Sequence, residues 1–211
     1  MEKVKLINDE KGVRLYIDGE KVYPSKSSKI LTLEDYGVKK NKKGEYCINK
    51  QIIVDKGEKL IIKPGTHIKV NDSIRTNGLL EGSIAVDGGV IEAIGTKKEP
   101  IVFISSNNKE CGNAIELRYS DNSIFKHCEF YYMIGLKQEL DRWKDIFDLD
   151  DRVKQSLYGA GLYCYRSDNL IVEDCKFYGC TSKDDSNIFL LNCKDEKIDE
   201  NSACKITREK Y

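Results

Sequence analysis

Four side chains of types that bind sugars stand at matching places in two similar stretches of this sequence. Glu116 and Arg118 occur in AIELRYSDN, and Tyr163 and Tyr165 occur in GLYCYRSDN. Tyrosine rings stack on the apolar faces of a pyranose, while a carboxylate and a guanidinium make bidentate hydrogen bonds with hydroxyl groups. If the four share one face, they form a candidate carbohydrate subsite. The alternative is an ordinary ladder of surface side chains.

These two stretches belong to an internal repeat. When the chain is shifted by 47 residues, positions 112–131 lie over 159–178 without a gap, and eight of the twenty pairs are identical. Average composition would give about one identity. A repeat of this size is typical of a solenoid, in which supersecondary units stack on one another. The identical pairs are Gly112/Gly159, Ser120/Ser167, Asp121/Asp168, Asn122/Asn169, Ile124/Ile171, Cys128/Cys175, Phe130/Phe177 and Tyr131/Tyr178.

A segment that lacks the strand-like pattern of the repeat separates its two copies. Its apolar residues follow helical spacing, which predicts one amphipathic helix or two short ones as an insert at about 135–158. Without this insert the repeat is about 24 residues long, close to one solenoid coil. Trp143 and Phe147 lie on the apolar stripe and form a candidate docking surface for a protein partner. Packing of the stripe against the solenoid flank explains them equally well.

Strand alternation assigns faces to the repeated residues. Ile115, Leu117 and Tyr119 are expected inward, stacked under Leu162, Cys164 and Arg166 or a slipped equivalent, which leaves the four sugar-binding candidates outward. Cys128 and Phe130 are expected to form inward ladders with Cys175 and Phe177. Buried thiols are the main interpretation of the cysteines. A Cys128–Cys175 disulfide is the alternative, because its Cα spacing would be permitted.

The stretches KGEKLIIKPGTHIKV and GSIAVDGGVIEAIGTKKEPIVFISS, followed by the repeated Ser-Asp-Asn turns, resemble the pectin-lyase-like superfamily over about 51–195. The resemblance implies an all-β fold: a right-handed parallel β-helix of about 4–5 coils at 46–211, interrupted by the helical insert. Residues 1–45 are expected to form an N-terminal cap, since Asp18-Gly19 stands between two β-rich runs and predicts a hairpin.

The same resemblance suggests catalytic candidates. Asp184 and Asp185 resemble the acidic pair of polygalacturonase-type hydrolases, with Arg166 as the basic residue. The N-x-D and G-H-G motifs of those hydrolases are missing, and adjacent side chains on a strand point to opposite faces, which favours a solvated turn. A lyase-type site would require Ca²⁺. The acidic run at Asp148–Asp151 also fits a junction between helices.

Composition excludes several classes of function. The 35 basic and 35 acidic residues balance, so the chain lacks the electrostatic footprint of a nucleic-acid-binding protein. No apolar run is long enough for a membrane span. None of the eight cysteines forms a CxxC pair, and His67 and His127 are far apart, so no metal site or other cofactor is predicted.

The leading hypothesis is a non-catalytic β-helix scaffold that binds carbohydrate, as a polysaccharide or an oligosaccharide, or is presented at a surface. A polysaccharide hydrolase or lyase is one alternative. A protein-interaction scaffold that docks through the insert is another. The N-terminal residues contain no signal peptide, whereas the resemblance to β-helix modules of bacterial surface and carbohydrate-related proteins suggests an extracellular or cell-surface location. The compartment therefore stays open.

Overall fold

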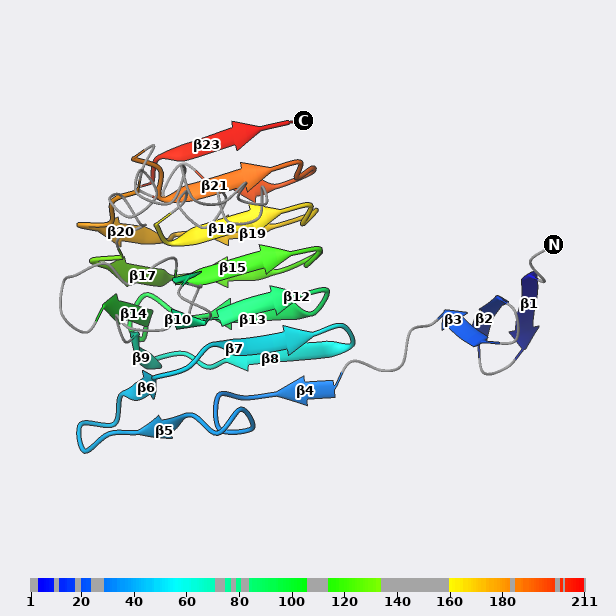
Figure 1. Ribbon diagram of the computed structural model, residues 1–211, viewed down its shortest axis with the longest axis horizontal. Helices are drawn as coiled ribbons and strands as arrows, with labels where there is room; N and C mark the ends of the chain where they lie inside the picture. Colours follow the sequence, from blue (N-terminus) through cyan, green and yellow to red (C-terminus); the bar gives the residue numbers. More distant parts are fainter. Residues whose placement is uncertain are drawn as a thin grey trace.

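A computed structural model of the chain describes the solenoid at residues 29–70, 84–105, 114–133, 160–182, 185–199, 202 and 204–210, and the backbone of five short strands outside these ranges. Three sheets run along the length of the solenoid. Within each sheet, the strands of successive coils lie above one another (Figure 1). All pairs in the three sheets are parallel except β5 with β6. The fold is the predicted all-β, right-handed parallel β-helix.

Each sheet has six strands, and four successive coils supply one strand to every sheet. Sheet I contains β7 (Ile52–Asp55), β12 (Ile84–Asp87), β15 (Ile115–Arg118), β18 (Leu162–Tyr165), β21 (Ile188–Leu191) and β23 (Ile206–Glu209). Sheet II contains β4 (Lys29–Leu31), β8 (Glu58–Ile62), β13 (Val90–Ile94), β16 (Ile124–Lys126), β19 (Ile171–Glu173) and β22 (Lys197–Ile198). Sheet III contains β5 (Lys39–Lys40), β6 (Tyr46–Ile48), β9 (His67–Val70), β14 (Ile101–Ser105), β17 (Cys128–Tyr131) and β20 (Lys176–Tyr178).

Two small antiparallel sheets contain the remaining strands of the described residues. One contains β1 (Val4–Asp9), β2 (Gly12–Ile17) and β3 (Glu20–Tyr23), and the other pairs β10 (Arg75–Thr76) with β11 (Leu79–Leu80). The pairing of β2 with β3 agrees with a hairpin at this point of the chain. Its role as a cap stays a prediction. Strands β4 and β5 already join sheets II and III, so solenoid pairing begins before residue 46.

The strand register reproduces the 47-residue shift seen in the sequence. Ile115 pairs with Leu162 in sheet I, Ile124 with Ile171 in sheet II, and Phe130 with Phe177 in sheet III. Equivalent side chains therefore lie above one another on consecutive coils, about 4.8 Å apart. The repeat exists because two stacked coils place the same residue types in the same environments.

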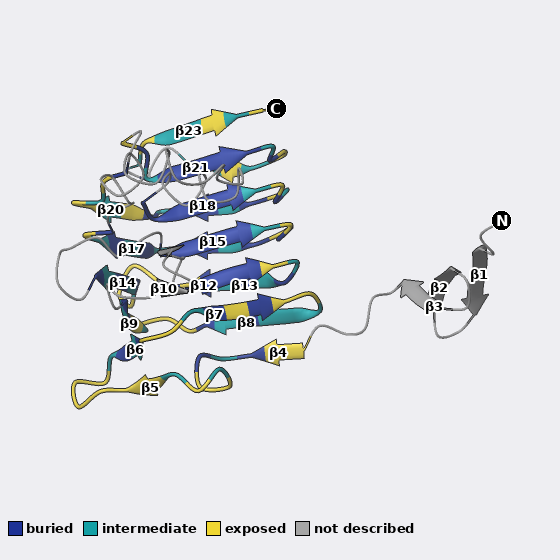
Figure 2. Cartoon of the chain, viewed as in Figure 1, coloured by how far each residue is buried: buried dark blue, intermediate teal, exposed yellow. Residues whose placement is uncertain are grey.

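Apolar ladders fill the interior of the solenoid. Figure 2 shows in dark blue the buried residues along the solenoid strands. Phe103, Phe130 and Phe177 stack in sequence, with ring centroids 4.9 Å and 4.7 Å apart. Cys128 and Cys175 are buried in the same core as free thiols, as in the main interpretation of the sequence. Gly161 is required beside this ladder, because a Cβ atom there would lie 2.3 Å from the Phe177 ring.

The repeated Ser-Asp-Asn stretch forms the turn between sheets I and II. The Ser120 N–H donates to the buried Ser167 Oγ at 3.0 Å, and the Asp168 N–H donates to Asp121 Oδ1 at 2.8 Å. Asn122 and Asn169 adopt positive φ angles of 64° and 57°, a backbone conformation that asparagine tolerates. Each turn therefore uses its side chains to satisfy the backbone of the neighbouring coil.

Tyr119 and Arg166 differ from the predicted alternation. They have φ angles of 51° and 46° and are exposed, whereas both were expected to continue the inward ladder. The left-handed backbone at the strand end reverses the side-chain direction, which places both residues at the corner that leaves sheet I. The insert predicted at 135–158, with Trp143 and Phe147, lies outside the described residues, as do Asp184 and the acidic run Asp148–Asp151.

Candidate functional site

The outer face of sheet I carries the four sugar-binding candidates. Glu116 pairs with Tyr163 and Arg118 pairs with Tyr165 on adjacent strands β15 and β18, so the structure brings the four together. Their neighbours Ile115 and Leu117 point into the core, as alternation requires. The four candidates therefore lie on one outer face, which two adjacent coils share.

The four candidates differ in their exposure to solvent, so they do not form the open subsite that an outward-facing position predicts. Glu116 and Tyr163 are each only 1% exposed, although they face away from the solenoid core. Tyr163 belongs to a second hydrophobic cluster with Phe189 and Leu191, and its ring stacks on Phe189 at 5.8 Å. Alternation predicts which face a side chain occupies, but not whether that face is covered.

The Tyr163 hydroxyl is an unusual member of this buried cluster. Within the part of the chain that the structure describes, it is a buried polar atom without a hydrogen-bond partner. Burial raises the pKa of Tyr163 far above its ordinary value, and the Glu116 carboxylate adds to the rise. The hydroxyl is therefore neutral at any physiological pH. Its position makes Tyr163 a packing residue in this structure rather than a solvent-accessible contact.

Glu116 orients Arg118 at the border of the buried region. Arg118 Nη2 donates a hydrogen bond to Glu116 Oε2 at 2.7 Å, and the Arg118 side chain is 35% exposed. A charge-assisted bond to a buried carboxylate holds the guanidinium in one orientation. Arg118 therefore presents a fixed edge of N–H donors toward solvent.

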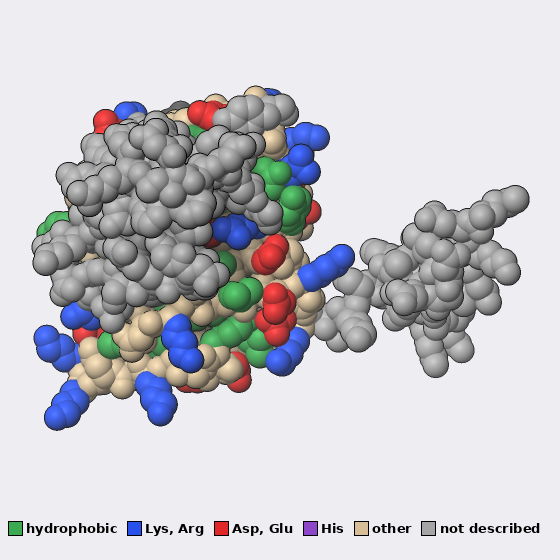
Figure 3. All heavy atoms as spheres, viewed as in Figure 1, with side chains coloured by type: hydrophobic (Ala, Val, Ile, Leu, Met, Phe, Trp, Pro, Cys, Tyr) green, Lys and Arg blue, Asp and Glu red, His purple; other side chains and the backbone are tan. Residues whose placement is uncertain are grey.

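The next residues along β15 and β18 form an accessible cluster, here called the tyrosine–arginine edge: Arg118, Tyr119, Tyr165 and Arg166. The Tyr119 and Tyr165 rings meet edge to face, with centroids 5.4 Å apart and an interplanar angle of 78°. The Arg166 guanidinium carbon lies 5.3 Å from the Tyr165 ring centroid, a cation–π distance. Figure 3 shows acidic and basic side chains beside apolar ones at the right-hand end of this face.

The edge suits an anionic sugar. Arg166 has no ion pair among the described residues, and Tyr119 is 52% exposed. An aromatic ring beside two guanidinium groups can stack on a pyranose and bind its carboxylate at the same time. The two coils contribute one tyrosine and one arginine each.

The structure does not bring Asp185 and Arg166 together, and Asp184 lies outside the described residues. Asp185 is exposed in a turn with φ of 59°, where its N–H donates to the Ser182 carbonyl at 3.1 Å. It precedes the start of β21, whereas Arg166 follows the end of β18, the neighbouring parallel strand. The two residues therefore stand at opposite ends of sheet I. The turn expected as the alternative accounts for Asp185.

A second group of tyrosines on the outer face of sheet III was not singled out from the sequence. Tyr131 and Tyr178 stack with centroids 4.8 Å apart, and Tyr132 lies 6.3 Å from Tyr131. Tyr132 and Tyr178 are each 41% exposed. The signal was present, because Tyr131 and Tyr178 are an identical pair of the repeat, yet their alternation with Phe130 and Phe177 made them look like ordinary surface positions.

A cavity of about 270 Å³ adjoins these tyrosines at the corner between sheets II and III. Lys176 Nζ lies 3.6 Å from Glu129 Oε1, and the Tyr131 hydroxyl donates to Glu129 Oε2 at 2.8 Å. Burial, together with this hydrogen bond, raises the pKa of Tyr131 to about 12. Glu129 therefore has both Lys176 and the Tyr131 hydroxyl as partners in this corner. The lining residues are Thr96, Lys97, Pro100, His127, Glu129, Asp174 and Lys176.

The described residues contain no group of three or more His, Cys, Asp or Glu side chains placed to hold a metal ion. A membrane-crossing helix is likewise absent from the part of the chain that the structure describes.

The fold and the comparison with protein families agree on the class of protein. Residues 32–115 match the family model of the pectate-lyase-like β-helix domain. The solenoid of three parallel sheets extends this architecture beyond the matched residues. The fold is therefore a parallel β-helix, and residues 32–115 are similar to the pectate-lyase-like β-helix family. Searches of curated proteins and of solved structures found no significant match.

Proposed function

We propose that this chain is a non-catalytic β-helix module that binds an anionic carbohydrate at the tyrosine–arginine edge. The observation that carries the proposal is the contact of Tyr165 with both Tyr119 and Arg166. The centroid of the Tyr165 ring lies 5.4 Å from that of the Tyr119 ring and 5.3 Å from the Arg166 guanidinium carbon. These residues come from consecutive coils and are accessible, so a sugar chain can contact both coils at once.

The rigidity of the scaffold supports a binding role. Backbone hydrogen bonds continue through the corner: the Tyr119 N–H donates to the Tyr165 carbonyl at 3.0 Å, and the Arg166 N–H donates to the Leu191 carbonyl at 2.9 Å. A site built on stacked strands holds its side chains before the ligand arrives, which lowers the entropic cost of binding. The same rigidity suits a module that is presented at a surface.

The separation of Asp185 from Arg166 favours binding over catalysis. A glycoside hydrolase needs two carboxyl groups that flank the scissile bond, and a lyase needs a base beside the uronate. The enzyme hypothesis is therefore the competing outcome of the test. Docking through Trp143 and Phe147 stays a prediction, because both lie outside the described residues.

The proposal is tested by affinity electrophoresis in gels that contain polygalacturonate or a neutral polysaccharide such as hydroxyethylcellulose. Tyr165→Ala and Arg166→Gln are the test variants, and Tyr178→Ala on sheet III is the matched control. We expect polygalacturonate to retard the wild-type protein. Each test variant should bind about tenfold more weakly, which corresponds to about 1.4 kcal/mol, and the control should bind normally.

Products are measured in the same samples, with and without Ca²⁺, as new reducing ends and unsaturated uronates. Turnover that Asp185→Asn abolishes would make the protein an enzyme and overturn the proposal. Absence of retardation, or retardation that only Tyr178→Ala weakens, would also contradict it. In the second case the carbohydrate site would be the sheet III corner.

A further inference from the structure

The tyrosine–arginine edge is part of a longer row of residues on the outer face of sheet I. Pairing in register on β7, β12, β15 and β18 gives this row the order Asp55, Asp87, Arg118 and Tyr165. Each member follows a fully buried core residue of its own strand, and its side chain therefore points outward. Neighbouring members are about 4.8 Å apart along the solenoid. One row thus carries two carboxylates, a guanidinium and an aromatic ring in succession.

The two carboxylates of this row are not compensated by a cation. Asp55 and Asp87 are exposed and have no ion pair among the described residues. The guanidinium of Arg118, which follows them in the row, is bonded at 2.7 Å to the buried carboxylate of Glu116. Like charges at directly opposed positions on neighbouring strands repel one another. A cationic group beside Asp55 and Asp87 would remove this repulsion.

The charge of the row changes sign between β12 and β15. Arg118 and the exposed Arg166 supply positive charge on the next two coils. Beyond Tyr165 the row continues to Leu191, which is only 1% exposed, so the accessible basic part spans two coils. A chain of uronates that extends past Arg118 toward the first coils therefore places a carboxylate beside Asp87, where it is repelled.

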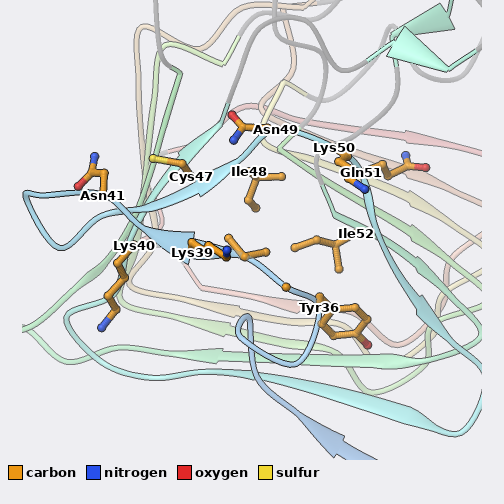
Figure 4. Close-up of a pocket in the computed structure, with 12 residues that line it drawn as sticks. Tyr36, Lys39, Lys40, Asn41, Cys47, Ile48, Asn49, Lys50, Gln51 and Ile52 are labelled. Carbon is orange, nitrogen blue, oxygen red and sulfur yellow. The ribbon is translucent and has the colours of Figure 1, made fainter.

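The cavity at the first coil does not offer a comparable combination (Figure 4). Its volume is about 510 Å³, but the apolar residues Ile48 and Ile52 in its lining belong to the packed core and are only 1% and 4% exposed. A ligand in this cavity would have no apolar surface to cover there. The edge, in contrast, combines the exposed ring of Tyr119 with charges of both signs.

We propose that the edge selects a saccharide in which an amino sugar is linked to a uronate. This inference rests on the proposed carbohydrate function and names the class of ligand that the same site takes. The uronate carboxylate binds between Arg118 and Arg166, with its ring against Tyr119, and the ammonium group of the amino sugar binds beside Asp87 and Asp55. Charge-assisted hydrogen bonds at both ends strengthen binding, and their opposite signs fix the direction of the chain. A pure uronate uses the basic half alone and binds more weakly.

The experiment uses the full chain and a tetrasaccharide of alternating glucuronate and glucosamine, in its free-amine form and in its N-acetylated form. The two forms have the same length and the same carboxylates, and only the first carries ammonium groups. Calorimetric titration is carried out at about pH 6, where an amino group is protonated. We expect the wild-type protein to bind the free-amine form about fivefold more tightly than the acetylated form.

Charge-neutral variants locate the source of this preference. Asp87→Asn should abolish it, because the ammonium group then loses a carboxylate partner. Glu99→Gln, at the corner between sheets II and III, is the matched control and should leave it unchanged. Equal affinity of the wild-type protein for the two forms would overturn the inference. A preference that Asp87→Asn leaves intact would do the same, as would one that Glu99→Gln also abolishes.

Trigalacturonate, which has no amino group, separates this inference from the carbohydrate proposal. Arg166→Gln should weaken its binding, whereas Asp87→Asn should not. If trigalacturonate binding depends on Arg166 but the preference for the amine is absent, the inference fails and the carbohydrate proposal stands. If Arg166→Gln changes the binding of neither saccharide, the edge is not the site and both fail.

Discussion

Phe130 and Phe177 are 47 residues apart in the chain, yet their rings stack with centroids 4.7 Å apart and planes inclined by 4°. Phe130 also stacks on Phe103, so it is the middle ring of a three-ring ladder and is fully buried. The ladder joins three consecutive coils through one column of side chains. The stability of the solenoid should therefore depend on its middle member.

Phe130→Ala should lower the free energy of unfolding by about 3–5 kcal/mol, the usual loss for a buried aromatic residue. The cost arises because both flanking rings lose a stacking partner and a cavity is left between coils. Urea unfolding followed by far-ultraviolet circular dichroism measures the loss. Tyr178→Ala removes a stacked but 41% exposed ring and should cost much less. Equal losses would show that the inner ladder has no special role.

Gly161→Ala should destabilise the fold by about 1–3 kcal/mol through overpacking. The new Cβ would lie 2.3 Å from the Phe177 ring, and the backbone at Asn187 leaves little room on the other side, with its carbonyl at 3.3 Å. The second substitution Phe177→Leu in the same chain should recover part of the loss, because it removes the ring edge that clashes. A double-mutant cycle in urea checks this, and additive losses would contradict the contact.

Ser167→Ala should cost about 1–3 kcal/mol, because it leaves the buried N–H of Ser120 without its acceptor. Asp121→Ala removes the acceptor of the Asp168 N–H at an exposed position, where water can replace it. This second variant should therefore lose less than half as much stability. Both losses are compared by chemical denaturation. The reverse order would mean that exposed turn contacts dominate the stacking of coils.

The buried thiols predict a loss of stability at alkaline pH. Burial raises the pKa of Cys128 and of Cys164 well above the ordinary thiol value. Unfolded thiols ionise above about pH 8.5, whereas the folded ones remain protonated. Their contribution to stability is thus complete below that pH and is lost as the pH rises further. Unfolding titrations at pH 7 and pH 9.5 measure the difference.

Reaction with a thiol reagent at pH 8 offers an independent check on the same cysteines. Cys128, Cys164 and Cys175 should react only after the chain unfolds, since each is fully buried. Rapid modification of the native protein at these positions would contradict their burial. Two cysteines that fail to react even in denaturant would instead support the disulfide alternative for Cys128 and Cys175.

The repeat predicted the β-helix and its register because identical residues recur wherever coils stack. The 47-residue shift predicts that Phe130 lies beneath Phe177, and the pairing of β17 with β20 confirms it. Strand alternation likewise placed Arg118 and Tyr165 on one outer face. These features depend only on the spacing of residues along the chain, so they can be predicted from the sequence.

Other features depend on contacts that spacing does not encode. The exposure of Glu116 and Tyr163 depends on what covers sheet I, and strand alternation does not predict this. The outward turn of Tyr119 depends on a positive φ, which its residue type does not signal. These parts of the candidate sites could be found only from the assembled fold.

The most direct test of the carbohydrate-binding account is calorimetric titration of the protein with trigalacturonate, for the wild type and for Tyr165→Ala/Arg166→Gln. The account predicts measurable heat and a single class of sites in the wild type, weakened by about a hundredfold in the double variant, which corresponds to about 2.8 kcal/mol. Equal affinity of the two proteins would contradict it, and so would the absence of binding to the wild type.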